Sequence, residues 1–170
     1  MRRFGKFLAV AALAMVSYSA SAELAPQWSK GTMVANVNVG FDNVDFGTTA
    51  SLDYVLVDEW WMGHFTVGGQ VGYASWGNEY WKDNYIGIMP RATYGLNITD
   101  QFEVHVAVGL GVEFEKEHYK VDDSHYSYTH TTSEELVGCR YFLTDNLAVM
   151  AEAGYSLHFP AFRVGISFKL

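Results

Sequence analysis

The residues best suited to chemistry lie in a polar segment, 115–131, which holds three histidines, three tyrosines and six charged residues. Imidazole and carboxylate groups are competent metal ligands. The groups available here belong to His118, Asp122, Asp123, His125 and His130. Their spacing matches no known metal site, and histidines in polar loops are usually solvated. We therefore expect no bound metal and no other cofactor.

The same segment contains a histidine and a serine two residues apart, His125 and Ser127. Glu134 or Glu135 could orient this histidine, as the acid does in a Ser-His-acid triad. In a segment so rich in histidine, serine and tyrosine, however, this spacing is close to chance. We therefore predict no catalytic residues.

A third group of ionisable residues is scattered through otherwise apolar stretches, in equal numbers of each sign. Its members are Asp53, Glu103, Glu113 and Glu152 together with Arg91, Arg140, Arg163 and Lys169. Charges that are removed from water must be paired. This balance predicts a structural network of buried ion pairs, in which Arg140 and Glu152 meet as diagonal neighbours across a turn at Asp145.

The elements that must position these residues are β-strands, because apolar residues recur at every second position. The clearest run is 102–114, where seven apolar residues alternate with Glu, His, Ala and Gly. The same alternation predicts eight strands, at 32–40, 48–57, 63–74, 84–96, 102–114, 132–143, 147–157 and 161–170. Short turns alternate with longer polar loops at 75–83 and 115–131, as in up-and-down antiparallel hairpins. Pro90 interrupts the fourth strand and predicts a bulge there or a different register.

The two faces of these strands favour a membrane barrel over a water-soluble one. We expect the apolar face to carry no charge, as lipid exposure requires. The opposite face mixes glycines with ionisable residues, which suits a lumen barely wide enough for side chains. The fold class predicted is all-β, an eight-stranded antiparallel up-and-down transmembrane β-barrel with both termini on the periplasmic side.

The first 22 residues predict export through the Sec pathway. A basic leader precedes the apolar run 7–16, and Ala20-Ser21-Ala22 forms a small-x-small cleavage signature. We therefore expect a signal peptide at 1–22 and a barrel domain at 23–170. That domain has 8 Lys and Arg against 19 Asp and Glu, a formal charge of −11 that argues against nucleic acid as a partner. With one cysteine, Cys139, no internal disulfide can form.

Two motifs in the last third of the chain resemble those of a known family. Arg163-x-Gly165-x-x-Phe168-x-Leu170 is similar to the C-terminal signal that outer-membrane barrels present to their assembly machinery, with Leu in place of the commoner final Phe. The stretch 138–147 resembles the closing hairpin of small opacity-like and outer-membrane-protein-X-like barrels. This resemblance implies a barrel in the outer membrane of a Gram-negative cell. Its partners would be outer-membrane lipid, periplasmic chaperones and the barrel assembly machinery.

The resemblance does not imply a single activity, because that family includes adhesins and structural barrels. Our leading interpretation is a non-enzymatic barrel with a plugged, charge-paired lumen. Its segment 115–131 would contact an extracellular or host ligand, or support envelope integrity. One alternative is a lipid A-modifying barrel, since His125-x-Ser127 resembles the His-x-Ser pair of lipid A deacylases, although that pair normally lies on a strand near the chain end. Another is a pore for small solutes, which a lumen filled with side chains disfavours.

Overall fold

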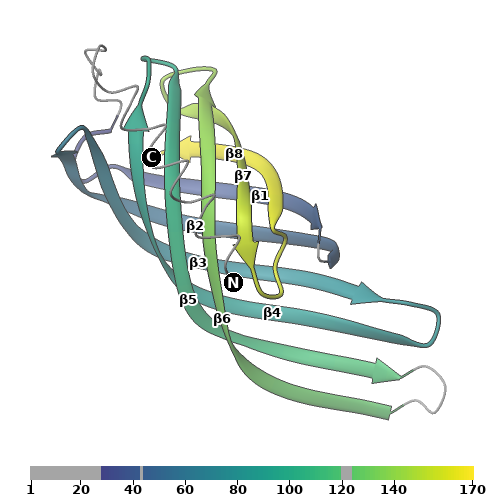
Figure 1. Ribbon diagram of the computed structural model, residues 1–170. Helices are drawn as coiled ribbons and strands as arrows, with labels where there is room; N and C mark the ends of the chain where they lie inside the picture. The colour runs from purple at the N-terminus through teal and green to yellow at the C-terminus, as the bar shows by residue number, and fades with distance from the viewer. Residues whose placement is uncertain (1–27, 43, 120–123) are drawn as a thin grey trace, which may run out of the picture.

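The computed structural model describes residues 28–42, 44–119 and 124–170, so the predicted signal peptide lies outside the described residues. These residues form eight strands: β1 (Met33–Asp42), β2 (Val44–Trp60), β3 (Gly63–Gly77), β4 (Trp81–Asn97), β5 (Phe102–Tyr119), β6 (Ser124–Phe142), β7 (Leu147–Ser156) and β8 (Phe162–Lys169). Each strand pairs antiparallel with the next, and β1 pairs with β8 to close the barrel (Figure 1). The predicted fold class is therefore confirmed. In the part of the chain that the structure describes, no helix is long and apolar enough to cross a bilayer.

Several strands are longer than predicted, and the described parts of the polar segment 115–131 belong to strands. β5 and β6 contain 18 and 19 residues, and they remain paired as far as Tyr119 opposite Ser124. Most of the segment is therefore the outer part of the β5–β6 hairpin. Alternation reveals a strand only where one of its faces is apolar, so a ladder with two polar faces escaped prediction. Figure 1 shows the β3–β4 and β5–β6 hairpins extending beyond the rest of the barrel.

Pro90 causes neither the bulge nor the register change that the sequence predicted. It lies opposite Gly69 in an uninterrupted β3–β4 ladder. On the β5 side, the register before it (Ile88 opposite Val112) and after it (Arg91 opposite Gly109) is the same. The strand therefore accommodates the missing N–H group with no insertion of a residue.

The outer surface of the barrel is apolar and its interior is polar. On β5, the outward-facing Val108, Leu110 and Phe114 are 52%, 65% and 51% exposed, whereas Glu103 and His105 inside are fully buried. This arrangement is the inverse of that in a water-soluble barrel and is the one required in a bilayer. The apolar band ends at Ile86 on β4 and at Phe114 on β5, and the next outward residues on both strands are polar.

The lipid-facing surface is not free of charge, contrary to the prediction. Glu135 is exposed on the outer face of β6, opposite Val108 on β5 and Tyr155 on β7. The predicted sixth strand contains Glu134 and Glu135 side by side, so either choice of face leaves one glutamate outside. The structure places Glu134 in the lumen and Glu135 on the outer surface.

Candidate functional site

The centre of the lumen holds a cluster of buried charges from five strands. Arg91 on β4 contacts Glu152 on β7, and its Nη1 donates to Oε1 of Gln70 at 3.0 Å. Arg163 on β8 donates from Nε to Oε2 of Glu152 at 2.5 Å and from Nη1 to Oε2 of Glu134 at 3.0 Å. All five side chains belong to residues that are between 0 and 3% exposed. The two guanidinium groups are therefore neutralised by the two carboxylates, as buried charges require.

A second cluster lies around Glu103, nearer the end of the barrel that carries the short turns. Arg140 on β6 donates from Nη1 to Oε1 of Glu103 at 2.5 Å, and Nε1 of Trp28 donates to Oε2 at 2.6 Å. His105 bridges the two clusters, with Nδ1 at 3.2 Å from Glu103 and Nε2 at 3.0 Å from Glu152. The lumen therefore contains one connected polar network.

The expected pair between Arg140 and Glu152 does not form. The residues opposite them in the β6–β7 ladder are Met150 and Gly138, and Glu152 is held by Arg91 and Arg163 from other strands. Arg140 instead pairs with Glu103, which lies directly opposite it in the β5–β6 ladder. A partner across the β6–β7 turn was predicted, but Arg140 also has a neighbour on β5, the other strand beside β6. The sequence alone does not reveal which of the two it meets.

The other predicted network residues lie apart from these clusters. Asp53 is buried and accepts hydrogen bonds from Asn36 at 2.9 Å and Ser51 at 3.4 Å. Glu113 and Lys169 lie near opposite ends of the lumen. Sequence reasoning did not include four members of the network: His64, Gln70, His105 and Glu134. The sequence could have revealed them, because all four occupy positions of the strands that face the lumen.

Trp28 closes the lumen at the short-turn end. It is 1% exposed, and its ring lies 5.4 Å from that of His64 and 5.3 Å from that of Phe142. The guanidinium of Arg140 and the ammonium of Lys169 lie 5.8 and 5.6 Å from the centre of the indole ring. This closure was missed because Trp28 precedes the first strand and belongs to no alternating pattern.

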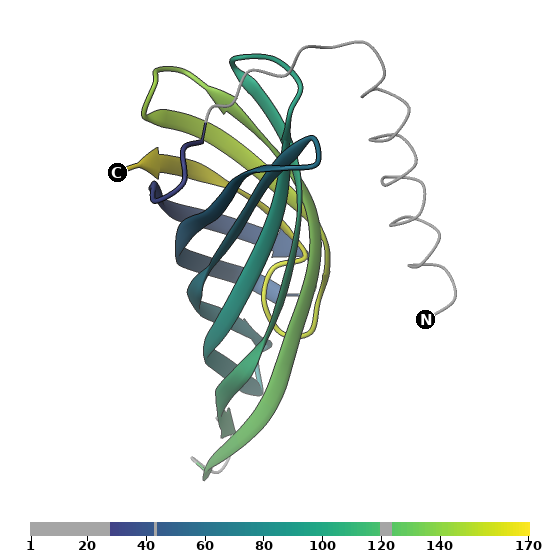
Figure 2. The same cartoon turned by 90° about the vertical axis from the view of Figure 1, so that its left-hand side faces the viewer.

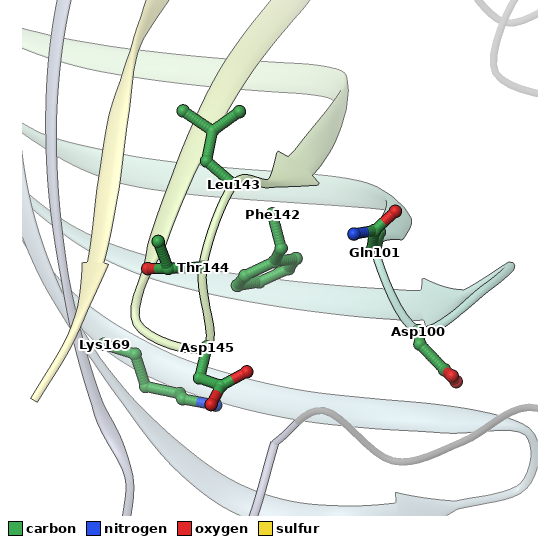
Figure 3. Close-up of a pocket in the computed structure, with 7 residues that line it drawn as sticks. All are labelled: Asp100, Gln101, Phe142, Leu143, Thr144, Asp145 and Lys169. Atoms are coloured by element: carbon green, nitrogen blue, oxygen red, sulfur yellow. The ribbon is translucent and has the colours of Figure 1, made fainter.

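A pocket of about 460 Å³ opens beside this closed end. It is lined by Asp100, Gln101, Phe142, Leu143, Thr144, Asp145 and Lys169. Figure 3 shows Phe142 between the β4–β5 turn and the β6–β7 turn, with Asp145 and Lys169 on the same side. The Thr144 hydroxyl accepts hydrogen bonds from the N–H groups of Asn146 and Leu147, so it stabilises its own turn. No nucleophile and base are paired among the lining residues that the structure describes.

The opposite end of the lumen is closed by the connection between β7 and β8. Phe159 is 1% exposed, and a Cβ atom at Gly72 or Gly87 would lie only 2.7 or 2.6 Å from its ring. The glycines therefore make the space that the phenyl ring fills. Next to it, His158 contacts Glu113 through Nδ1 and stacks on Tyr85 at 4.8 Å.

Carboxylates gather above this closure, on the inner faces of β4 and β5. Glu115 accepts a hydrogen bond from the Tyr85 hydroxyl at 3.0 Å and lies 2.9 Å from Nε2 of His130. On the part of β4 that projects beyond the apolar band, burial and then the charges of Glu117 and Glu115 raise the pKa of Asp83 to about 6. This opening therefore repels anions.

The structure does not assemble the metal site or the triad that we considered. His118 and His125 stack at 4.3 Å on the outer face, whereas His130 points inward beside Glu115. The candidates Asp122 and Asp123 lie outside the described residues, and within the described ranges no group of three or more metal-ligating residues is found.

The proposed partners of His125 in a triad lie elsewhere on β6. Glu134 is in the lumen beside Arg163, and Glu135 faces outward far along the strand. His125 and Ser127 share the outer face, but no described carboxylate among these candidates orients the histidine.

The strand pairing and the apolar outer surface are those of a transmembrane barrel. Comparison with protein families identifies the family to which this barrel belongs. The family model described as outer membrane protein beta-barrel domain matches residues 8–163. The chain belongs to this family. It is a β-barrel of the Gram-negative outer membrane. In such barrels the short turns are periplasmic and the longer loops are extracellular.

Solved structures show the same fold at low sequence identity. The N-terminal β-barrel domain of Pseudomonas aeruginosa OprF is 15% identical, covers 84% of this chain and 100% of that one, and has a TM-score of 0.56. A de novo designed transmembrane β-barrel is 18% identical over 84% of this chain and 98% of its own, with a TM-score of 0.51. The attachment invasion locus protein Ail of Yersinia pestis is 15% identical over 83% and 96%, with a TM-score of 0.47. A comparison with curated proteins finds no match.

Proposed function

We propose that this outer-membrane barrel is non-enzymatic, has a plugged lumen and acts through its extracellular hairpins. The observation that carries this proposal is that the ionisable side chains of the lumen bind one another. Arg91, Arg163 and Glu152 are each at most 3% exposed. Trp28 below and Phe159 above are each 1% exposed, so the network is covered at both ends. A reactive group in such a network would have neither a free substrate site nor a path to one.

The β5–β6 hairpin offers the largest surface for an extracellular partner. Beyond Phe114 it projects past the apolar band. Figure 2 shows this hairpin extending beyond the other strands. Its exposed side chains include Tyr126 and Tyr128, at 50% and 46%. Tyrosine is enriched at protein interfaces because it presents a large, amphipathic surface with few rotatable bonds. We therefore propose that this hairpin carries the site for an extracellular or host ligand.

Shortening the hairpin tests this proposal. Lys116 and Ser127 are opposite each other, so residues 117–126 can be replaced by an Asn-Gly turn. The matched control replaces residues 78–81 of the β3–β4 hairpin with the same turn, because Gly77 and Lys82 are also opposite each other. Cells that display each form are assayed for adhesion to epithelial monolayers and to matrix-coated surfaces, and heat-modifiable gel mobility reports folding.

We expect both forms to fold and only the β5–β6 deletion to lose adhesion. Unchanged adhesion by that form would contradict the proposed role of the hairpin.

The lipid A-modifying alternative has no supporting arrangement around His125 and Ser127 in the described residues.

Two proposals about biogenesis remain. Cleavage between Ala22 and Glu23 is expected, and the intact mass of the protein from outer membranes will show it.

We also propose that Arg163, Gly165, Phe168 and Leu170 act as the assembly signal. Arg163 and Gly165 face the lumen, whereas Phe168 faces lipid, so half of this motif is accessible from the membrane side.

A further inference from the structure

The outer wall of the barrel carries a polar patch directly above the apolar band, on β4, β5 and β6. It consists of two rows of laterally paired residues. The lower row is Asn84, Lys116 and Ser127, and the upper row is Lys82, His118 and His125. Immediately below, Ile86 and Phe114 belong to the lipid-facing surface and are 55% and 51% exposed. The patch therefore lies at the height of the outer-leaflet headgroups.

The patch concentrates the positive charge of the extracellular outer surface. Every other described cation lies in the lumen or at the periplasmic end; these are Arg91, Arg140, Arg163, Lys169 and Lys30. Lys82 and Lys116 are the cations that remain in the described ranges, and both are exposed on this patch. In a barrel domain with a formal charge of −11, two lysines on adjacent strands at one height form a local site for an anion.

The patch also has a recess and neutral hydrogen-bond donors. A cavity of about 230 Å³ is lined by Asn84, Lys116, Glu117, His118, His125, Tyr126 and Ser127. The rings of His118 and His125 stack at 4.3 Å along one side. Glu117 is the carboxylate among these lining residues, and it belongs to the inward phase of β5, opposite Asp83.

We propose that this patch binds the phosphate of an anionic lipid headgroup in the outer leaflet. The ammonium groups of Lys82 and Lys116 supply the charge, and the Asn84 amide and the Ser127 hydroxyl supply hydrogen bonds. The hydrocarbon stems of the lysines cover the upper edge of the apolar band while their ammonium groups remain among the headgroups. The position of the patch against the band favours a lipid over free phosphate, because the acyl chains of the lipid would contact Ile86 and Phe114.

Lipid retention by the folded barrel tests the proposal. The barrel in a zwitterionic detergent is incubated with diphosphorylated lipid A, phosphatidylglycerol or phosphatidylcholine, and bound lipid is counted by native mass spectrometry. The test variant is Lys82→Gln with Lys116→Gln. Lys30→Gln is the matched control, since it removes a cation at the periplasmic end. Heat-modifiable mobility verifies that each variant is folded.

We expect the wild type and Lys30→Gln to retain both anionic lipids in preference to phosphatidylcholine. The double variant should bind them about 25-fold more weakly, from a contribution of about fivefold for each lysine near a charged membrane surface. Equal retention of lipid A by the double variant and the wild type would overturn the proposal. Displacement of the lipid by equimolar inorganic phosphate, or binding of soluble sulfated polysaccharide in place of lipid, would also overturn it. None of these results depends on the ligand of the β5–β6 hairpin, because Lys82 and Lys116 are substituted with residues 117–126 left intact.

Discussion

Single side chains in the lumen are stabilised by partners from several parts of the chain. Glu103 on β5 accepts from Arg140 on β6 and from Trp28, which precedes β1, so one carboxylate joins three parts of the chain. Removing one partner of such a buried pair leaves an uncompensated charge, whereas removing both leaves a neutral site. The partners of each charge are therefore measurable by double-mutant cycles.

The pairing of Arg140 with Glu103 is tested by one such cycle. Arg140→Met or Glu103→Gln alone should lower the free energy of unfolding by about 3–5 kcal/mol, and the double variant should recover much of that loss. The measurement is the urea midpoint of the bilayer-embedded barrel. A cycle between Arg140 and Glu152 serves as the control and should be close to additive. Strong coupling in the control and none with Glu103 would contradict the contacts described here.

Removal of the exposed Glu135 carboxylate should instead raise the free energy of unfolding. A glutamate that faces lipid destabilises the folded barrel, by less than the ~2–4 kcal/mol of a lysine or arginine at the bilayer midplane. Glu135→Leu should therefore stabilise the embedded barrel, by about 1–2 kcal/mol in urea unfolding. Ser133→Leu, two residues towards the outside on the same face, controls for added apolar surface. A lower midpoint for Glu135→Leu would mean that the carboxylate has a favourable partner.

At the level of the strands, the period of two determines which residues face lipid. Val106 on β5 lies opposite Val137 on the outer wall, within the apolar band. Val106→Arg should block folding into bilayers, because an unpaired charge in the membrane costs ~2–4 kcal/mol. Thr129→Arg is the matched control, since Thr129 lies on the same outer wall opposite Phe114, at the upper edge of the band. Heat-modifiable gel mobility measures folding, and equal folding of the two variants would contradict the assigned faces.

Most of the barrel was predictable from the sequence. Apolar residues alternate with small or polar ones from 102 to 114 and in the last two strands, because one face of each strand contacts lipid and the other faces the lumen. The alternation could not reveal the outer parts of β5 and β6, where both faces are polar. It also could not reveal which charges meet in the lumen, since Arg140 pairs with Glu103, opposite it on β5, and not with Glu152 on β7. Trp28 and Phe159 were missed for a related reason, because neither lies in a strand. Contacts across a narrow lumen depend on side-chain length and on all eight strands together.

At the scale of the whole molecule, the barrel is a closed cylinder with a charged interior and an apolar wall. Trp28 and Phe159 close its two ends, and the network of Arg91, Glu152 and Arg163 fills the space between them. In the function proposed above, such a barrel would hold its extracellular hairpins at a fixed position above the membrane without conducting solutes. The closed lumen is the central claim, because it separates this function from that of a pore.

The most direct test of that claim is the ion conductance of the folded barrel in planar bilayers. The wild type should show no steady conductance steps, because paired side chains occupy the lumen and aromatic rings cover both ends. The variant with both Trp28→Ala and Phe159→Ala should admit water at the ends and leave the central network in place, so its conductance should stay small. Steady, open-channel conductance by the wild-type protein would contradict the closed lumen and would favour a pore.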